Sequence, residues 1–163
     1  MTTHYARILR NVAFCLLAVP LVLCGGSVPG ALVVVEGARN VRYDGESSVS
    51  YEVSEVHPAT DTLEQISSTL SNNGWRPLEE DVFNPGLKSS HVRGWTAFWD
   101  ATVDPQVYVD QWLAQWEDDA GNIAFYTLQY RSPSADPAER SQILEVSAAG
   151  IPAGIAKTFF TGQ

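Results

Sequence analysis

Cysteine and histidine are nearly missing from the part of this 163-residue chain that we expect to fold. Both cysteines, Cys15 and Cys24, lie in an uncharged N-terminal stretch, so the rest has no disulfide, no thiol nucleophile and no cysteine ligand for zinc. Only His57 and His91 follow residue 24, and their spacing is not that of a metal-binding pair. The glycines form neither G-x-G-x-x-G nor G-x-x-x-x-G-K, the phosphate-binding patterns. We therefore expect no metal and no cofactor.

Basic residues are also scarce. The chain has 10 Lys and Arg against 19 Asp and Glu, a formal net charge of -9. Without residues 1–24, which include Arg7 and Arg10, 8 basic and 19 acidic side chains remain, a formal charge of -11. Phosphate backbones and anionic lipid head groups repel a domain of this charge. We therefore expect no nucleic-acid partner, and membrane association through the N-terminal segment only.

The chain does possess an apolar N-terminus. Residues 11–35 carry no charge, and the densest apolar run within them, residues 12–24, is 13 residues long. That run is short for a transmembrane helix, which needs about 20 residues, and it fits the apolar region of a secretory signal. The small residues Gly25, Gly26 and Ser27 follow it, as at a cleavage site. This pattern predicts a signal peptide or membrane anchor over residues 1–27 and an exported protein.

The letters "LVLCGGS", residues 21–27, resemble the lipobox of bacterial lipoproteins, in which a cysteine becomes lipidated and is the first residue of the mature chain. Leu21 and Val22 fit that pattern, whereas Leu23 occupies a position where Gly, Ala or Ser is usual. The resemblance implies lipidation at Cys24 and nothing about activity. A retained signal anchor and a cleaved, secreted or periplasmic protein remain the alternatives.

After the targeting segment we expect a tether over residues 28–47 and a single domain over residues 48–163. Apolar residues alternate with polar ones in "SVSYEVSEV", which predicts a strand. The next segment, "DTLEQISSTLSNNG", predicts a helix that Asp61 and Glu64 cap and Gly74 ends. Its apolar stripe consists of Leu63, Ile66 and Leu70, while serines 67, 68 and 71 mark its solvated side.

Further alternating segments follow the helix. Residues 92–101 predict a strand, residues 107–132 predict a hairpin around the turn "DDAGN", and residues 143–148 predict a last strand. The fold class is therefore α+β, with one helix packed on a mostly antiparallel sheet of about four to six strands. The order of elements is similar to that of cystatin-like folds, where a meander wraps one helix, and this likeness of topology implies no function.

One short stretch, "NPGLKSSHVRGW", contains residue types used in catalysis. Ser89, Ser90 and His91, with Asp81 nearby in the sequence, supply the types of a serine hydrolase. No G-x-S-x-G elbow surrounds either serine. A turn followed by entry into a strand explains the same residues, so we treat the three as weak catalytic candidates.

Six aromatic residues on predicted strands are candidates for binding. They could form a platform for a sugar, a peptide or a protein, or they could be the core beneath the helix. Leu113, Phe98 and Phe125 fall on the opposite registers and could leave apolar surface exposed. The six candidates are Trp95, Trp99, Trp112, Trp116, Tyr126 and Tyr130.

The sequence thus favours a non-enzymatic, exported or membrane-tethered small acidic envelope protein, acting as an interaction domain for an envelope protein or a glycan. Two alternatives stay open. One is a secreted serine hydrolase that uses Ser89 or Ser90 with His91. The other is a glycan-binding module on an aromatic sheet face.

Overall fold

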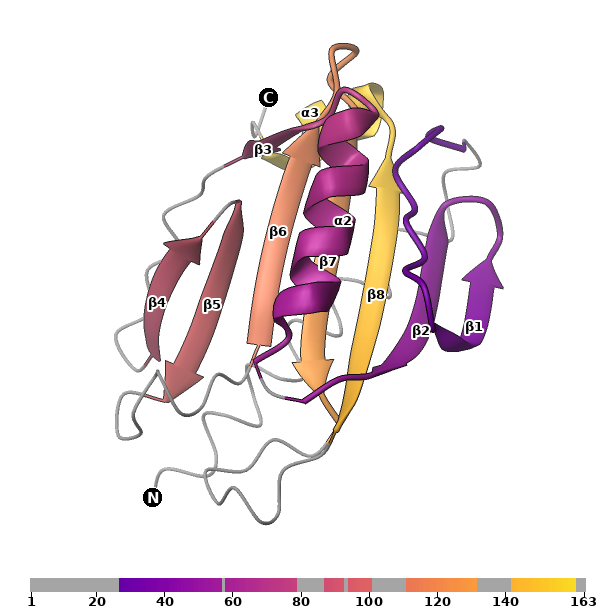
Figure 1. Ribbon diagram of the computed structural model, residues 1–163. Helices are drawn as coiled ribbons and strands as arrows, with labels where there is room; N and C mark the ends of the chain where they lie inside the picture. The colour runs from indigo at the N-terminus through magenta and orange to yellow at the C-terminus, as the bar shows by residue number, and fades with distance from the viewer. Residues whose placement is uncertain are drawn as a thin grey trace.

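Figure 1 presents the computed structural model, which describes residues 27–56, 58–78, 87–92, 94–100, 111–131 and 142–160. For residues 87–92, 98–100, 159 and 160 the description is limited to the backbone. Residues 1–26 of the predicted targeting segment, residues 1–27, lie outside the described residues. None of the described helices is long and apolar enough to cross a bilayer.

The fold is α+β, as the sequence predicts. One antiparallel sheet has the strand order β1-β2-β8-β7-β6-β5-β4, with β3 paired to β6 beside β5. The described part has eight strands and two helices, more than the four to six strands and one helix expected. The elements are β1 (Arg39–Asp44), β2 (Ser48–Ser54), α2 (Thr60–Asn72), β3 (Arg76–Leu78), β4 (Leu87–Val92), β5 (Trp95–Asp100), β6 (Gln111–Glu117), β7 (Ile123–Tyr130), β8 (Ile143–Ile151) and α3 (Ala153–Phe160).

The strands after α2 form a meander in which β4 to β8 are successive neighbours. The strand before the helix, β2, pairs with the last strand, β8, and β1 lies outside it at the sheet edge. The helix α2 lies across the middle of one face of the sheet (Figure 1). Alternate residues of β6 and β7 are buried on that face, as the period of a strand requires.

The cap of α2 differs from the prediction. Asp61 is not the N-cap; it lies in the first turn, and no side-chain cap bond forms at Ala59. Glu55, just after β2, takes this role, because its carboxylate accepts hydrogen bonds from the backbone N–H groups of Asp61 (2.8 Å) and Thr62 (3.2 Å) and from the Thr62 hydroxyl. A carboxylate at this position also interacts favourably with the helix dipole. The cap therefore comes from outside the helical sequence.

The predicted end of α2 and its buried stripe are confirmed. Gly74 has a φ of +86°, and the N–H of Trp75 donates to the carbonyl of Leu70 at 3.0 Å, a Schellman ending. Ile66 and Leu70 are fully buried, and Leu63 packs against the core. Thr62 is buried as well, which the pattern did not predict.

Residues 28–35, which we call the strap, fall in the predicted tether and yet pack into the core. Val28, Ala31, Val33 and Val35 are between 0% and 8% exposed and belong to the core cluster. The strap runs beside α2 on the same face of the sheet, as the indigo segment of Figure 1 shows. It then turns into β1, so residues 28–44 are packed or strand-paired rather than hanging free of the sheet.

The turn predicted at "DDAGN" joins β6 to β7. Asp118 organises it, because its carboxylate accepts hydrogen bonds from the backbone N–H groups of Ala120 (2.9 Å) and Asn122 (2.8 Å). Desolvation opposes ionisation of Asp118, but bonds from the side chain and backbone of Asn122 and from the backbone of Ala120 and Gly121 outweigh it and lower its pKa. Asn122 also accepts the N–H of Ala153 at the start of α3.

Candidate interaction surfaces

The aromatic candidates form the core beneath α2 rather than an exposed platform. Five of them are between 0% and 5% exposed, because they occupy the inward positions of β5, β6 and β7. The side chain of Trp99 lies outside the described residues. The buried five are Trp95, Trp112, Trp116, Tyr126 and Tyr130.

These aromatic residues join the sheet to the helix. Trp95 and Tyr126 meet edge to face with ring centroids 6.1 Å apart, and Trp112 meets Tyr130 in the same way at 6.0 Å. The indole N–H of Trp95 donates to the hydroxyl of Ser67 on α2 at 2.7 Å. Ser67 is therefore half-buried against the sheet, not part of the solvated side predicted for it.

Two buried tyrosines hold the strap. The Tyr126 hydroxyl donates to the carbonyl of Ala31 (2.6 Å) and accepts the N–H of Val33 (2.9 Å), and the Tyr51 hydroxyl donates to the carbonyl of Val33 (3.0 Å). Burial raises the pKa of both tyrosines. This arrangement satisfies backbone groups of an extended segment that has no strand partner of its own. The alternating pattern could place the tyrosines inside but could not reveal what they bind.

The catalytic candidates lie on an outer strand. Ser89, Ser90 and His91 belong to β4, where their backbones pair with Phe98, Ala97 and Thr96 of β5, respectively. Strand β4 is the last in the sheet order and ends at Val92, so these residues lie within a strand of their own; the single strand predicted over residues 92–101 is β5, which covers residues 95–100. The side chains of all three candidates, the whole of Asp81 and the lipidation candidate Cys24 lie outside the described residues.

The sheet face away from α2 has a shallow hollow of about 40 Å³. Leu113 and Phe125, which we expected on this side, line it from β6 and β7. Both are half-buried. The remaining lining residues are Leu78, Gly94, Thr96, Ala114 and Gln115.

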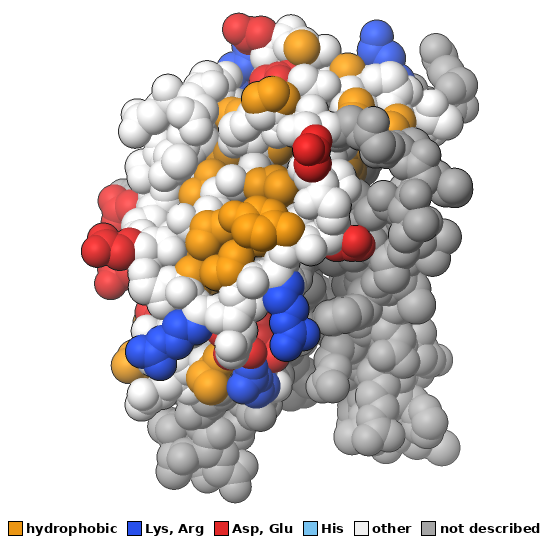
Figure 2. All heavy atoms as spheres, turned by 90° about the vertical axis from the view of Figure 1, so that its right-hand side faces the viewer, with side chains coloured by type: hydrophobic (Ala, Val, Ile, Leu, Met, Phe, Trp, Pro, Cys, Tyr) orange, Lys and Arg blue, Asp and Glu red, His pale blue; other side chains and the backbone are white. Residues whose placement is uncertain are grey.

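A second surface lies along the edge strand. Three exposed hydrophobic residues belong to the strap and β1: Val34 is 36% exposed, Val41 39% and Tyr43 63%. Every residue of β1 is exposed, including Arg39 and Arg42. Figure 2, which views this side, shows hydrophobic side chains gathered in a patch with Lys and Arg side chains near its lower end. We call these five residues the β1 flank.

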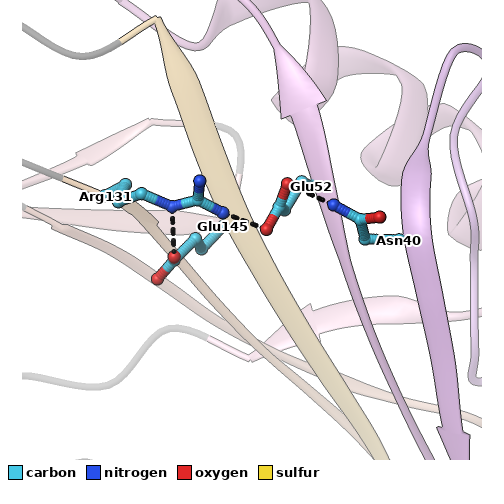
Figure 3. Close-up of polar contacts among 4 residues, drawn as sticks. All are labelled: Asn40, Glu52, Arg131 and Glu145. Carbon is cyan, nitrogen blue, oxygen red and sulfur yellow. Dashed lines mark hydrogen bonds and ion pairs between the residues drawn. The ribbon is translucent and has the colours of Figure 1, made fainter.

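A polar network crosses the sheet near this edge (Figure 3). Glu52 of β2 and Glu145 of β8 are directly opposite each other, an unfavourable pairing of like charges. Arg131 bridges them, with its Nε 3.0 Å from Glu145 and a terminal nitrogen bound to Glu52. The hydrogen bond to Glu145 is the first cause of a raised Arg131 pKa. Asn40 of β1, with a φ of +52°, donates to Glu52 at 2.8 Å.

Within the described ranges, no three His, Cys, Asp or Glu side chains are grouped so that they could hold a metal ion. Comparisons with protein families, with curated proteins and with solved structures give no match for this chain. The sequence, fold and surfaces described above are therefore the basis for a function.

Proposed function

We propose that the chain is an exported, non-enzymatic interaction domain held at the cell-envelope membrane by residues 1–27. One observation carries this proposal: among the described residues, packing against the core starts immediately after the apolar segment. Only Gly25, Gly26 and Ser27 separate Cys24 from Val28, which is 5% exposed. Three extended residues reach about 10 Å. A lipid on Cys24, or a helix ending there, would therefore carry the domain at the bilayer surface.

The hollow on the sheet face opposite α2 is the described surface that best suits an envelope partner. It combines the apolar side chains of Leu113 and Phe125 with the polar ones of Thr96 and Gln115. Such a mixture is typical of a site that receives one apolar side chain of another protein. It takes the place of the aromatic face as the proposed contact, because the described aromatic candidates are buried.

The two alternative functions, a serine hydrolase and a glycan-binding module, have less structural support. A serine hydrolase is favoured only by Ser89 and His91 lying two residues apart in one extended strand. A glycan-binding platform needs aromatic ring faces that are open to solvent. Five of its six candidate residues are buried, and the side chain of the sixth, Trp99, lies outside the described residues. The tethered interaction domain is therefore our first proposal.

The proposal that residues 1–27 hold the domain at the membrane is tested by measuring the intact mass of the chain. The chain carries a tag after Gln163 and is recovered separately from the membrane and soluble fractions. A membrane-bound chain that starts at Cys24 and carries acyl chains supports a lipoprotein, and a membrane-bound full-length chain supports a signal anchor. A chain that starts near Ser27 and stays soluble contradicts tethering.

The proposal that the hollow contacts an envelope protein is tested by photo-crosslinking in intact cells. A benzophenone amino acid replaces Phe125 at the hollow or, as a control, the exposed Thr69 on α2. We expect a defined adduct with one envelope protein from position 125 and not from position 69. The same adducts from both positions, or none from either, would remove the hollow as the contact surface.

A further inference from the structure

We infer that the β1 flank rests on the same bilayer that holds the N-terminal segment, so that the sheet stands with this edge toward the membrane. The inference depends on the proposed tethering. It departs from the expectation that only the N-terminal segment meets the membrane, because it assigns a second, non-covalent membrane contact to the folded domain and fixes the domain's orientation.

The course of the chain places the flank close to the anchor. The strap begins at Val28 and runs along this side of the sheet, and the N–H of Ala38 donates to the carbonyl of Val35 in the turn that leads into β1. Figure 1 shows the strap on the α2 side of the sheet near β2 and β8, and the turn leads from it to β1 at the outer edge beyond β2. Val34 of the strap and Val41 and Tyr43 of β1 therefore belong to one exposed side of the domain.

The chemistry of the flank suits the interface of a bilayer. Tyrosine places its ring at the level of the head groups, and arginine can lay its apolar stem on a surface while its guanidinium reaches phosphate. Arg39 and Arg42 bring two positive charges to a six-residue strand of an otherwise acidic domain. The exposed acids Glu36, Asp44 and Glu46 flank these arginines, with Asp44 only two residues from Arg42 on β1, so the attraction to lipid phosphate is local to the two guanidinium groups. Acids on distant faces are screened over about 8–10 Å.

The backbone of β1 disfavours a different occupant, namely a strand from a peptide or a second copy. The register of β1 on β2 shifts between Arg39 and Arg42, and Asn40 has a left-handed φ of +52°. Bulges and charged side chains on an edge strand hinder the pairing of another strand. Contacts must then come from side chains, as they do on a lipid surface.

The tether removes the need for high affinity. A domain held about 10 Å from the bilayer meets its surface at a high effective concentration, so the contact needs less affinity than it would in a free domain. The orientation also has a consequence for the hollow. With the β1 edge on the bilayer, both faces of the sheet point sideways, and the hollow faces in the direction from which a neighbouring membrane protein would approach.

The test uses the full tethered chain in vesicles whose lipids carry a spin-label quencher. A fluorophore is attached to Tyr43→Cys on the flank or, as the matched control, to Val56→Cys, which replaces another exposed hydrophobic residue beyond the other end of β2. The fluorophore must not label the two native cysteines. In a lipoprotein the lipid blocks Cys24, and in a signal anchor Cys15 and Cys24 are both replaced by serine. We expect quenching to be several-fold stronger at position 43 than at position 56.

A charge variant tests the chemistry of the contact. Arg39→Gln and Arg42→Gln should each weaken the position-43 contact about fivefold on vesicles rich in anionic lipid, and less on neutral vesicles. Arg76→Gln, which removes an exposed arginine paired with Asp119, is the control and should change nothing.

The outcomes separate this inference from the proposed function. Equal quenching at positions 43 and 56, in a chain whose intact mass proves it tethered, overturns the inference and leaves the tethering intact. Crosslinks between positions 43 of two copies, without lipid quenching, also overturn it and assign the flank to a dimer. A soluble chain that starts near Ser27 overturns the tethering itself.

Discussion

The hydroxyl of Tyr126 donates a hydrogen bond of 2.6 Å to the carbonyl of Ala31, a residue 95 positions earlier in the chain. This bond ties the central strand β7 to the strap, which directly follows the predicted targeting residues. The segment that follows the predicted targeting residues is thus part of the core. Any change that loosens the strap should therefore reduce the stability of the whole domain.

The first prediction concerns Tyr126→Phe. This change removes the hydroxyl that serves both Ala31 and Val33 and leaves two buried backbone groups without that partner. We expect the free energy of unfolding to fall by about 2–4 kcal/mol, since each unsatisfied buried group costs about 1–3 kcal/mol. Urea unfolding of the chain measures it. Tyr43→Phe, at an exposed position, is the control, and equal stability of the two variants would contradict the role of the strap.

A second prediction concerns the closeness of the strap to β8. A Cβ atom added at Gly150 would lie 3.0 Å from the Cβ of Ala31 and 3.1 Å from that of Val28. Gly150→Ala should therefore push the strap outward and lower stability by about 1–3 kcal/mol. Gly154→Ala, where no atom lies within 4 Å, should be neutral or slightly stabilising in α3. If thermal unfolding ranks the two variants the other way, the packing described here is wrong.

The third prediction separates the two possible caps of α2. Glu55→Ala removes the acceptor of the bonds from Asp61 and Thr62 and should lower the free energy of unfolding by about 1–2 kcal/mol. Asp61→Ala should lower it by only about 0.3–0.5 kcal/mol, through the helix dipole. Denaturant unfolding of both variants decides between them. A larger loss for Asp61→Ala would restore the capping box predicted from the sequence.

This contrast shows what local sequence pattern can reveal. The helix, its end at Gly74 and the burial of Ile66 and Leu70 follow from spacing within 14 residues and were predicted correctly, whereas the burial of Thr62 and the contact of Ser67 with the sheet were not. Its cap was not, because "DTLE" has the form of a capping box whereas Glu55 reaches the helix from the preceding segment. A pattern within the helix contains no information about such a partner.

The outer elements were missed for a related reason. All six residues of β1 are exposed, so the strand has no buried side to produce alternation, and the strap is extended without a strand partner. The buried aromatic residues were placed on the correct strands, but their burial depends on α2 and the strap covering one face. Which face of a sheet becomes covered is a property of the tertiary fold.

A fourth prediction addresses the hydrolase alternative. As a non-enzymatic domain, the folded chain should not react with a serine-directed fluorophosphonate probe. Labelling that Ser89→Ala or Ser90→Ala removes, and that His91→Ala also removes, would contradict our proposal and identify β4 as a catalytic strand. Ser50→Ala, at an exposed serine of β2, is the control for nonspecific labelling.

The last prediction concerns alkaline pH. Burial raises the pKa of Tyr51 and Tyr126 above the ordinary value of 10.0. Above about pH 10 the unfolded chain releases these protons whereas the folded chain retains them, so the unfolded state binds fewer protons and stability falls as pH rises. Each retained proton should contribute a slope of about 1.4 kcal/mol per pH unit. Urea unfolding between pH 8 and pH 11 should reveal this loss, and Tyr126→Phe should make it shallower. An unchanged slope in that variant would mean that Tyr126 is not held protonated in the fold.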